Sequence, residues 1–198
     1  MSLTPQQFDA VFDGFVESPT STRVFRLEAL QHYHVPNDDP FMAAFRNRAP
    51  RPSRTVRTSP WLARVAKSVL GSGKQWQRVH LIREPLSEYL KMEMQGYIES
   101  QAAGEEIFLA DADAPALSSL GPDFWIFDDP AHSAGGYAVL MHYDPNGQPE
   151  SFAFVDDPRQ LEALRAQRDT ALERSVALNE FLSNEALLIG VPSARAAS

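Results

Sequence analysis

The chain of 198 residues contains no cysteine. This absence excludes disulfide bonds, thiolate catalysis and metal sites that depend on Cys ligands. The sequence also has no apolar run of about 18 residues, and its first residues, MSLTPQQF, include neither a basic nor an apolar stretch. We therefore expect a cytoplasmic protein that does not enter a membrane. With 43% hydrophobic residues, the chain is long enough to bury the core of one domain.

Several well-known motifs are missing as well. The sequence has no HExxH, GxSxG or EF-hand pattern, and Gly71-Ser72-Gly73-Lys74 lacks the strand and spacing of a phosphate-binding loop. His142 and Asp144 lie two apart on a predicted strand, so they share a face on which a divalent cation could bind. The acidic residues that would accompany them are Asp128, Asp129, Asp156 and Asp157. Their spacing matches no named ligand pattern, so we interpret them as turn and helix-cap residues and expect no metal and no cofactor.

Hydrophobic periodicity predicts an α/β (α+β) protein with one mixed sheet. Alternation at 76–82, helical spacing at about 85–101 and a strand at 106–109 predict a β–α–β unit with parallel strands. Three short strands at 124–129, 137–144 and 151–157 follow as an antiparallel meander, because Gly- and Asn-containing turns join them. A long C-terminal helix begins at Asp157 and Pro158. We expect a single domain at 1–188, a mobile basic loop near 48–59 and a disordered tail at 189–198.

Acidic residues are absent between positions 41 and 83, although the formal net charge of the chain is −8. The segment holds ten of the 18 basic residues, and the remainder of the chain holds all 26 acidic ones. Such segregation of charge is typical of a surface that contacts phosphate groups. The alternative is a solvated basic loop that acids elsewhere in the fold balance. The candidate nucleic-acid-binding residues are Arg46, Arg48, Arg51, Arg54, Arg57, Arg64, Lys67 and Lys74.

The helix predicted near 85–101 offers candidate catalytic residues. Tyr89 and Glu93 are four residues apart, so they lie on one face of this helix. A phenol and a carboxylate placed in this way can bind an amine and move its proton. The alternative is a packed tyrosine beside a solvated glutamate.

Over most of its length the chain resembles an uncharacterised family of actinobacterial proteins that are commonly encoded beside helix-turn-helix regulators. The resemblance implies a shared fold and no particular activity. The matching stretches are Phe25-Arg26-Leu27-Glu28, Tyr33-x-Val35-Pro36, Pro60-Trp61-Leu62, Glu84-Pro85-Leu86-Ser87-x-Tyr89, Gly104-Glu105-Glu106-Ile107, Asp123-Phe124-Trp125-Ile126-Phe127-Asp128 and Val155-Asp156-Asp157-Pro158.

A local segment, Tyr89-Leu90-Lys91-Met92-Glu93, is similar to the Tyr-aliphatic-x-x-Glu motif of cyclodipeptide synthases. Those enzymes take aminoacyl groups from charged tRNA and join them as amides. The resemblance implies that Tyr89 and Glu93 hold the amino group of the aminoacyl moiety and that the basic segment contacts the acceptor arm of tRNA. The sequence departs from the motif because Gln95 stands in place of a proline, and it lacks the signature of the nucleophilic serine.

These observations lead to three functional hypotheses. The first is an enzyme that forms an amide bond from aminoacyl-tRNA. The second is a non-enzymatic module of a helix-turn-helix regulatory system that binds a partner protein or a small ligand through the aromatic sheet residues Phe124, Trp125, Phe127, Tyr137 and Tyr143. The third is a nucleic-acid binder without chemistry. The helix that begins Pro60-Trp61-Leu62 has no Arg, Asn or Gln at its start, which disfavours direct readout of DNA bases.

Overall fold

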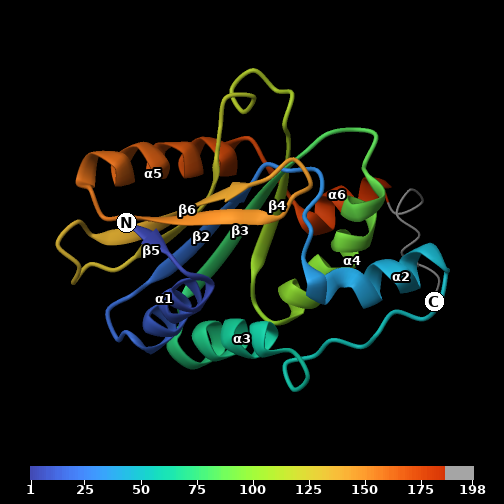
Figure 1. The fold of residues 1–198 in the computed structure, drawn as a ribbon, viewed down its shortest axis with the longest axis horizontal. Coiled ribbons are helices and arrows are strands. Elements are labelled where there is room, and N and C mark those ends of the chain that lie inside the picture. The colour runs from blue at the N-terminus through green and yellow to red at the C-terminus, as the bar shows by residue number, and fades with distance from the viewer. Residues whose placement is uncertain (186–198) are drawn as a thin grey trace.

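The computed structural model describes residues 1–185. Within them, one eight-stranded sheet runs in the order β1-β7-β6-β5-β2-β3-β4-β8, with helices on both of its faces (Figure 1). The strands are β1 (Ser2–Leu3), β2 (Arg23–Glu28), β3 (Gln75–Ile82), β4 (Glu106–Asp111), β5 (Asp123–Asp128), β6 (Gly136–Tyr143), β7 (Pro149–Val155) and β8 (Val176–Ala177). The helices are α1 (Pro5–Glu17), a 3₁₀ turn η1 (Pro36–Asp38), α2 (Asp39–Arg46), α3 (Pro60–Ser72), α4 (Glu88–Ala102), α5 (Pro158–Glu173) and α6 (Leu178–Glu185).

The predicted fold class is confirmed. Strands β3 and β4 pair in parallel and α4 connects them, which is the expected β–α–β unit, and β2 pairs in parallel with β3. Strands β5, β6 and β7 form the expected antiparallel meander. The structure adds β1, which pairs with β7 at the edge of the sheet. The expected tail at 189–198 lies outside the described residues.

Two helix boundaries differ from the prediction. Helix α4 begins three residues after Pro85, because the side chain of Ser87 accepts a hydrogen bond from the amide of Leu90 and so caps the helix there. The C-terminal helix ends at Glu173, earlier than its apolar spacing indicates. The apolar spacing from Leu161 onward predicts a helix that continues to Leu178, but Leu178 begins α6 and is fully buried against α4 and β4.

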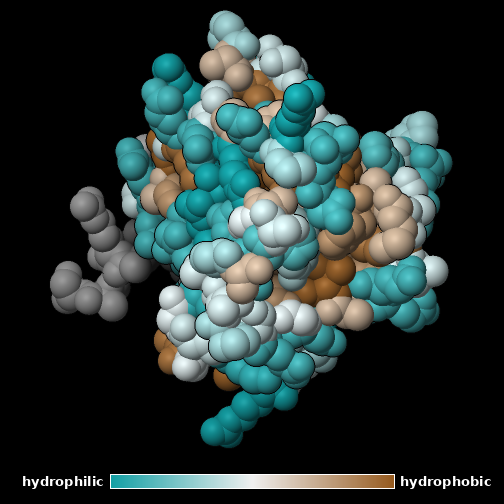
Figure 2. Space-filling model, turned by 90° about the vertical axis from the view of Figure 1, so that its left-hand side faces the viewer, coloured by the Kyte–Doolittle hydropathy of each residue, from teal (hydrophilic) through white to brown (hydrophobic). Residues whose placement is uncertain are grey.

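The two faces of the sheet differ in chemistry. The face under α5 is apolar and includes Phe25, Leu27, Val79 and Leu81. The opposite face is also apolar where α1 and α3 cover it, with an aromatic cluster built around Phe12, Trp76, Trp125 and Phe127. The exterior seen in Figure 2 is mostly hydrophilic, and hydrophobic side chains show in patches between polar ones. The hydrophobic core is therefore divided between the two layers that flank the sheet.

The centre of the second face is charged. Arg26 and Glu28 on β2 alternate with the apolar Phe25 and Leu27, so they point away from α5. Arg78 and His80 do the same on β3, and the strand register places Arg26 beside Arg78 and Glu28 beside His80. Because helices cover this face too, its charged side chains are buried, and they form one side of the pocket described below.

Candidate functional site

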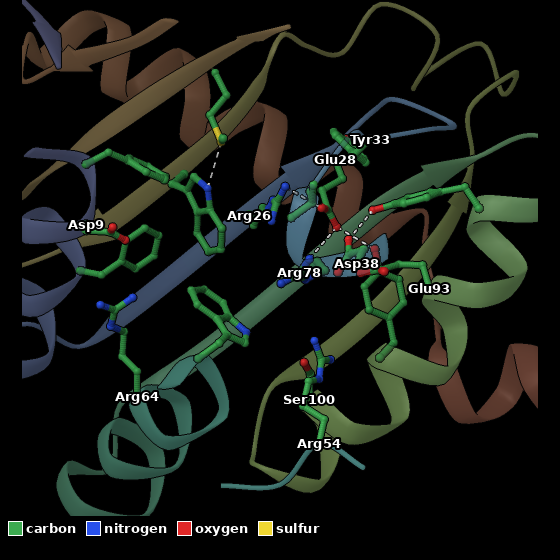
Figure 3. A pocket seen from close by; sticks show the side chains of 18 residues that line it. Asp9, Arg26, Glu28, Tyr33, Asp38, Arg54, Arg64, Arg78, Glu93 and Ser100 are labelled. Atoms are coloured by element: carbon green, nitrogen blue, oxygen red, sulfur yellow. Dashed lines mark hydrogen bonds and ion pairs between the residues drawn. The ribbon is translucent and has the colours of Figure 1, made fainter. Parts of the chain in front are cut away.

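A pocket with a volume of about 300 Å³ lies between α1, α3, α4 and the charged face of the sheet (Figure 3). Helix α4 lines it with Tyr89, Glu93, Tyr97 and Ser100, which follow one another at spacings of four, four and three residues. This spacing keeps all four on one side of the helix. The hypothesis that Tyr89 and Glu93 face a common pocket therefore agrees with their positions. The other lining residues are Phe8, Asp9, Phe12, Arg26, Glu28, Tyr33, Val35, Asp38, Arg54, Trp61, Arg64, Arg78, Trp125 and Met141.

The floor of the pocket is a buried ionic network centred on Glu28. One carboxylate oxygen of Glu28 lies 2.7 Å from Nη2 of Arg26, and the other accepts from Nη1 of Arg78 at 2.8 Å. Nε of Arg78 donates to Glu105 at 2.8 Å. Burial by itself would raise the pKa of Glu28, but the two guanidinium groups hold it well below its usual range. Glu28 is therefore an ionised and fully paired carboxylate.

The hydrogen bonds around His80 determine its protonation state. Nε2 of His80 lies 2.7 Å from the carbonyl oxygen of Leu30, which can only accept, so Nε2 carries a hydrogen. The hydroxyl of Tyr97 lies 2.7 Å from the ionised Glu28 and 2.6 Å from Nδ1 of His80. The hydroxyl of Tyr97 therefore has one proton for two neighbouring acceptors, Glu28 and the bare Nδ1 of His80. Burial lowers the pKa of His80, so its ring is neutral at pH 7 and carries its hydrogen on Nε2.

We predict that His80 is the neutral Nε2–H tautomer at pH 7, because burial lowers its pKa and the carbonyl oxygen of Leu30 accepts from Nε2. Nitrogen-15 chemical shifts of labelled histidine measure this directly, and exposed His142 serves as an internal reference in the same spectrum. Hydrogens on both ring nitrogens of His80 at pH 7 would contradict the assignment.

Three carboxylates in the pocket form no ion pair within the described residues: Glu93 and Asp38 at one end, and Asp9 at the other. Within residues 1–185, neither Glu93 nor Asp38 forms an ion pair. Burial, with the negative charges of Asp38 and Glu28, raises the pKa of Glu93 to about 7. Burial also raises the pKa of Asp38. The hydroxyl of Tyr89 donates to Asp38 at 3.4 Å, and burial raises the pKa of Tyr89 as well. This end of the pocket is acidic, and the guanidinium of Arg54 in its wall offsets part of the charge without forming an ion pair with either carboxylate.

The opposite end of the pocket is aromatic. Its walls are Phe8 and Phe12 from α1, Trp61 from α3 and Trp125 from β5, together with Met141. The ring centroids of Phe12 and Trp125 are 4.8 Å apart, and those of Trp61 and Trp125 are 5.7 Å apart. Figure 3 shows Asp9 and Arg64 beside this aromatic group, on the side away from Asp38 and Glu93. The pocket thus has one apolar wall and one acidic wall.

Most of the candidate nucleic-acid-binding residues are already paired within the protein. Arg46 binds Glu88 at 2.7 Å, Arg64 binds Asp13 at 2.9 Å, and Arg51 and Arg54 both bind Glu99. Only Arg48, Arg57 and Lys67 among the eight are exposed and form no ion pair inside the part of the chain that the structure describes. Arg48, Arg57 and Lys67 are therefore the candidates whose charge no acid in the described residues balances through an ion pair.

The basic loop near 48–59 runs along α4 (cyan, between α2 and α3 in Figure 1). Nε of Arg54 donates to Glu99 at 2.9 Å, and Nη2 donates to the carbonyl of Gly96 at 3.0 Å. The guanidinium of Arg51 lies over the ring of Phe41, 4.3 Å from its centroid. These contacts attach the loop to the helix that carries Tyr89 and Glu93. They also place Arg54 in the wall of the pocket.

Lys74 has a structural position. Its side chain is buried, and Nζ donates to the carbonyl oxygens of Phe15, Val16 and Ser18 at 2.5–2.9 Å. These carbonyls lie at the C-terminal end of α1, where the helix leaves acceptors unsatisfied and favours a cation. Lys74 is therefore not available to a nucleic acid at the surface.

We predict that Lys74→Met lowers the free energy of unfolding by about 2–4 kcal/mol, because three buried carbonyls lose a charged donor. Denaturant titration measures the change. Lys67→Met is the matched control on an exposed lysine and is expected to leave stability within about 0.5 kcal/mol. Equal stability of the two variants would show that the buried contacts contribute nothing.

Two of the carboxylates considered for a metal site serve a turn and a helix cap, whereas a third, Asp128, forms ion pairs. Asp144 accepts from the amides of Asn146 and Gln148, and Asp157 caps α5 by accepting from Gln160. Asp128 is paired with Arg23, Arg165 and Arg168. Across residues 1–185, no group of three or more His, Asp or Glu side chains is arranged to hold a metal ion.

Three of the aromatic residues considered for partner binding are in the core. Phe124, Trp125 and Phe127 are buried, while Tyr137 and Tyr143 are half-buried. The sequence analysis also missed Arg26, Glu28, Asp38 and Arg78 as pocket residues. The signal for three of them was present, because charged residues that alternate with apolar ones on a central strand must point into a covered face.

The fold and the pocket together define an α/β protein with a combined acidic and aromatic site on one face of a mixed sheet. The chain belongs to the family described as a domain of unknown function, DUF6879, whose family model matches residues 6–183. Neither a search of curated proteins nor a search of solved structures finds a match. None of the helices within residues 1–185 combines the length and the apolar character needed to cross a membrane.

Proposed function

We propose that the pocket binds the ammonium group of a small organic amine at Glu93, Asp38 and Tyr89. The observation that supports this function is the pair of carboxylates, Glu93 and Asp38, that face a common pocket and have no counterion within the described residues. A buried carboxylate without a partner is unfavourable, and an ammonium group supplies both the opposite charge and three hydrogen-bond donors. Two carboxylates and a phenol oxygen offer acceptors for all three. The site would operate in the cytoplasm, which the lack of cysteine supports.

The pKa of Glu93 links amine binding to pH. In the free protein Glu93 titrates at about 7. A bound ammonium favours the ionised carboxylate, so binding lowers the pKa of Glu93 and releases a proton when it occurs below pH 7. Affinity therefore rises with pH up to about 7 and then levels off while the amine remains protonated.

We predict that the affinity for 2-phenylethylamine rises about tenfold for each unit by which the pH increases toward 7, because one proton must leave Glu93 on binding. Isothermal titration calorimetry between pH 5 and 8 measures the affinity. Glu93→Gln should weaken binding at pH 8 by at least about tenfold and remove the pH dependence. Glu88→Gln, an exposed residue on the same helix, is the matched control and should behave like the unaltered protein.

The fold of Glu93→Gln can be checked independently. Because the pKa of Glu93 is raised from 4.5 to about 7 by folding, its contribution to stability is complete below pH 4.5 and is lost as the pH rises through 7. Glutamine does not ionise, so the variant should be more stable than the unaltered protein at pH 8 and equally stable at pH 4. A variant with native stability but undiminished amine affinity would refute the proposed role of Glu93.

A second candidate function is the formation of an amide bond from aminoacyl-tRNA, and the pKa of about 7 for Glu93 favours it. This value suits a general base that removes a proton from the ammonium group. The freed amine nitrogen would then attack the acyl carbonyl, the ester bond would break, and the ribose oxygen would leave as a hydroxyl after taking the second proton. The hydroxyl of Ser100, on the same side of α4, is a candidate acceptor for a covalent acyl group.

This second function predicts that the protein consumes aminoacyl-tRNA and forms an amide product, and that Glu93→Gln slows the reaction about 100-fold or more. Chromatography of the products from radiolabelled aminoacyl-tRNA measures the rate. Replacing Arg48, Arg57 and Lys67 together by Gln should weaken tRNA binding and make it less dependent on salt. Three phosphate contacts correspond to a slope of about −2 to −3 in a plot of log affinity against log salt concentration. Amine binding without any turnover of aminoacyl-tRNA would leave the ligand-binding function alone.

A further inference from the structure

We infer that the amine is a free α-amino acid with a large apolar side chain, and that Arg26 binds its carboxylate. This inference rests on the proposed amine site and adds the remaining two groups of the ligand. It starts from a guanidinium in the pocket that is not fully paired. Nε of Arg26 is enclosed by protein and makes no hydrogen bond to any residue in the described range 1–185, and Nη2 contacts Glu28, so Nη1 is the nitrogen at which a ligand carboxylate can bind.

The guanidinium of Arg26 is held in place by its neighbours. Nη2 lies 2.7 Å from Glu28, and the group lies over the ring of Trp125, 4.8 Å from its centroid. Only 16% of the side chain is exposed, and Arg26 lines the same pocket as Glu93. A fixed, charged donor without an acceptor is costly when buried, so this position favours a ligand oxygen.

The two arginines on the sheet side of the pocket differ in how fully they are paired. Arg78 contacts two carboxylates, Glu28 and Glu105, whereas Arg26 contacts only Glu28, which it shares with Arg78. Arg26 is therefore the guanidinium that can bind an anionic group of a ligand. A ligand with an anionic group toward Arg26 and a cationic group toward Glu93 matches both sides, and an α-amino acid carries these two groups on one carbon atom.

The aromatic wall of the pocket indicates the third group of the ligand, which is its apolar side chain. Trp125 lies directly beneath the guanidinium of Arg26, and Phe12, Trp61 and Met141 continue the same wall. A side chain that leaves the α-carbon next to Arg26 therefore meets aromatic rings and a thioether. Aromatic rings contact such walls favourably, and a pocket of about 300 Å³ suits a molecule of amino-acid size.

Four probes separate the three contacts by calorimetry at pH 8. L-phenylalanine has all three groups, 2-phenylethylamine lacks the carboxylate, 3-phenylpropionate lacks the amine, and L-alanine lacks the ring. We expect L-phenylalanine to bind at least about tenfold more tightly than each of the others, because each loses a charged hydrogen bond or the burial of a ring.

Arg26→Lys tests the carboxylate contact within the protein. Lysine keeps the positive charge opposite Glu28 but has no second nitrogen for the carboxylate, so the preference for L-phenylalanine over 2-phenylethylamine should be lost. Arg83→Lys, an exposed residue paired with Asp113, is the matched control and should keep the preference for L-phenylalanine. If Arg26→Lys fails to fold, the four probes on the unaltered protein still decide the question.

The outcomes distinguish this inference from the function on which it rests. If 2-phenylethylamine binds as tightly as L-phenylalanine, the carboxylate contact is refuted while the amine site stands. If L-alanine equals L-phenylalanine, the apolar contact is refuted. If 3-phenylpropionate binds more tightly than both amines, or if no amine binds, then the amine site and this inference are both wrong.

Discussion

The carboxylate of Glu28 is the interaction on which the pocket depends. It joins three elements, because it contacts Arg26 on its own strand, Arg78 on β3 and Tyr97 on α4. A buried ion pair gains little net stability, since desolvation of the charges offsets their attraction, but loss of one partner leaves an uncompensated charge that costs about 3–5 kcal/mol. Arg26, Arg78 and Tyr97 are therefore interdependent. The network fixes the orientation of the α4 face that carries Glu93 and the position of the guanidinium that lies over Trp125.

Full neutralisation of Glu28 determines which groups can bind a ligand. Because two guanidinium groups occupy Glu28, the unpaired acids of the pocket lie on helical elements rather than on the sheet: Glu93, Asp38 and, at the aromatic end, Asp9. The guanidinium of Arg26 lies on the sheet, and Glu93 and Asp38 lie on the helical side of the same pocket. A site with two opposite walls recognises a zwitterion better than a simple amine, because each wall binds one of its charges.

The sequence was sufficient to predict the parts of this structure that depend on local patterns. The β–α–β unit and the meander follow from the alternation of apolar residues and from the turn residues, and the shared face of Tyr89 and Glu93 follows from their spacing of four. The burial of Arg78 and Lys74 could not be predicted in the same way. Their partners are Glu28, Glu105 and the carbonyls at the end of α1, which are 27 to 59 residues away in sequence, so no local window contains both members of a contact.

The segment from 41 to 83, which lacks acids, has its explanation in this long-range pairing. Of its ten basic residues, Arg46, Arg51, Arg54, Arg64, Arg78 and Arg83 bind acids on α1, β2, α4 and the segments around β4. A segment of one charge sign that folds between segments of the opposite sign forms many ion pairs with residues distant in sequence and few with its own neighbours. This organisation favours the interpretation in which acids elsewhere in the fold balance the basic segment. It also directs the search for function away from the outer surface and toward Glu93 and Asp38, acids that these basic residues leave unpaired inside the pocket.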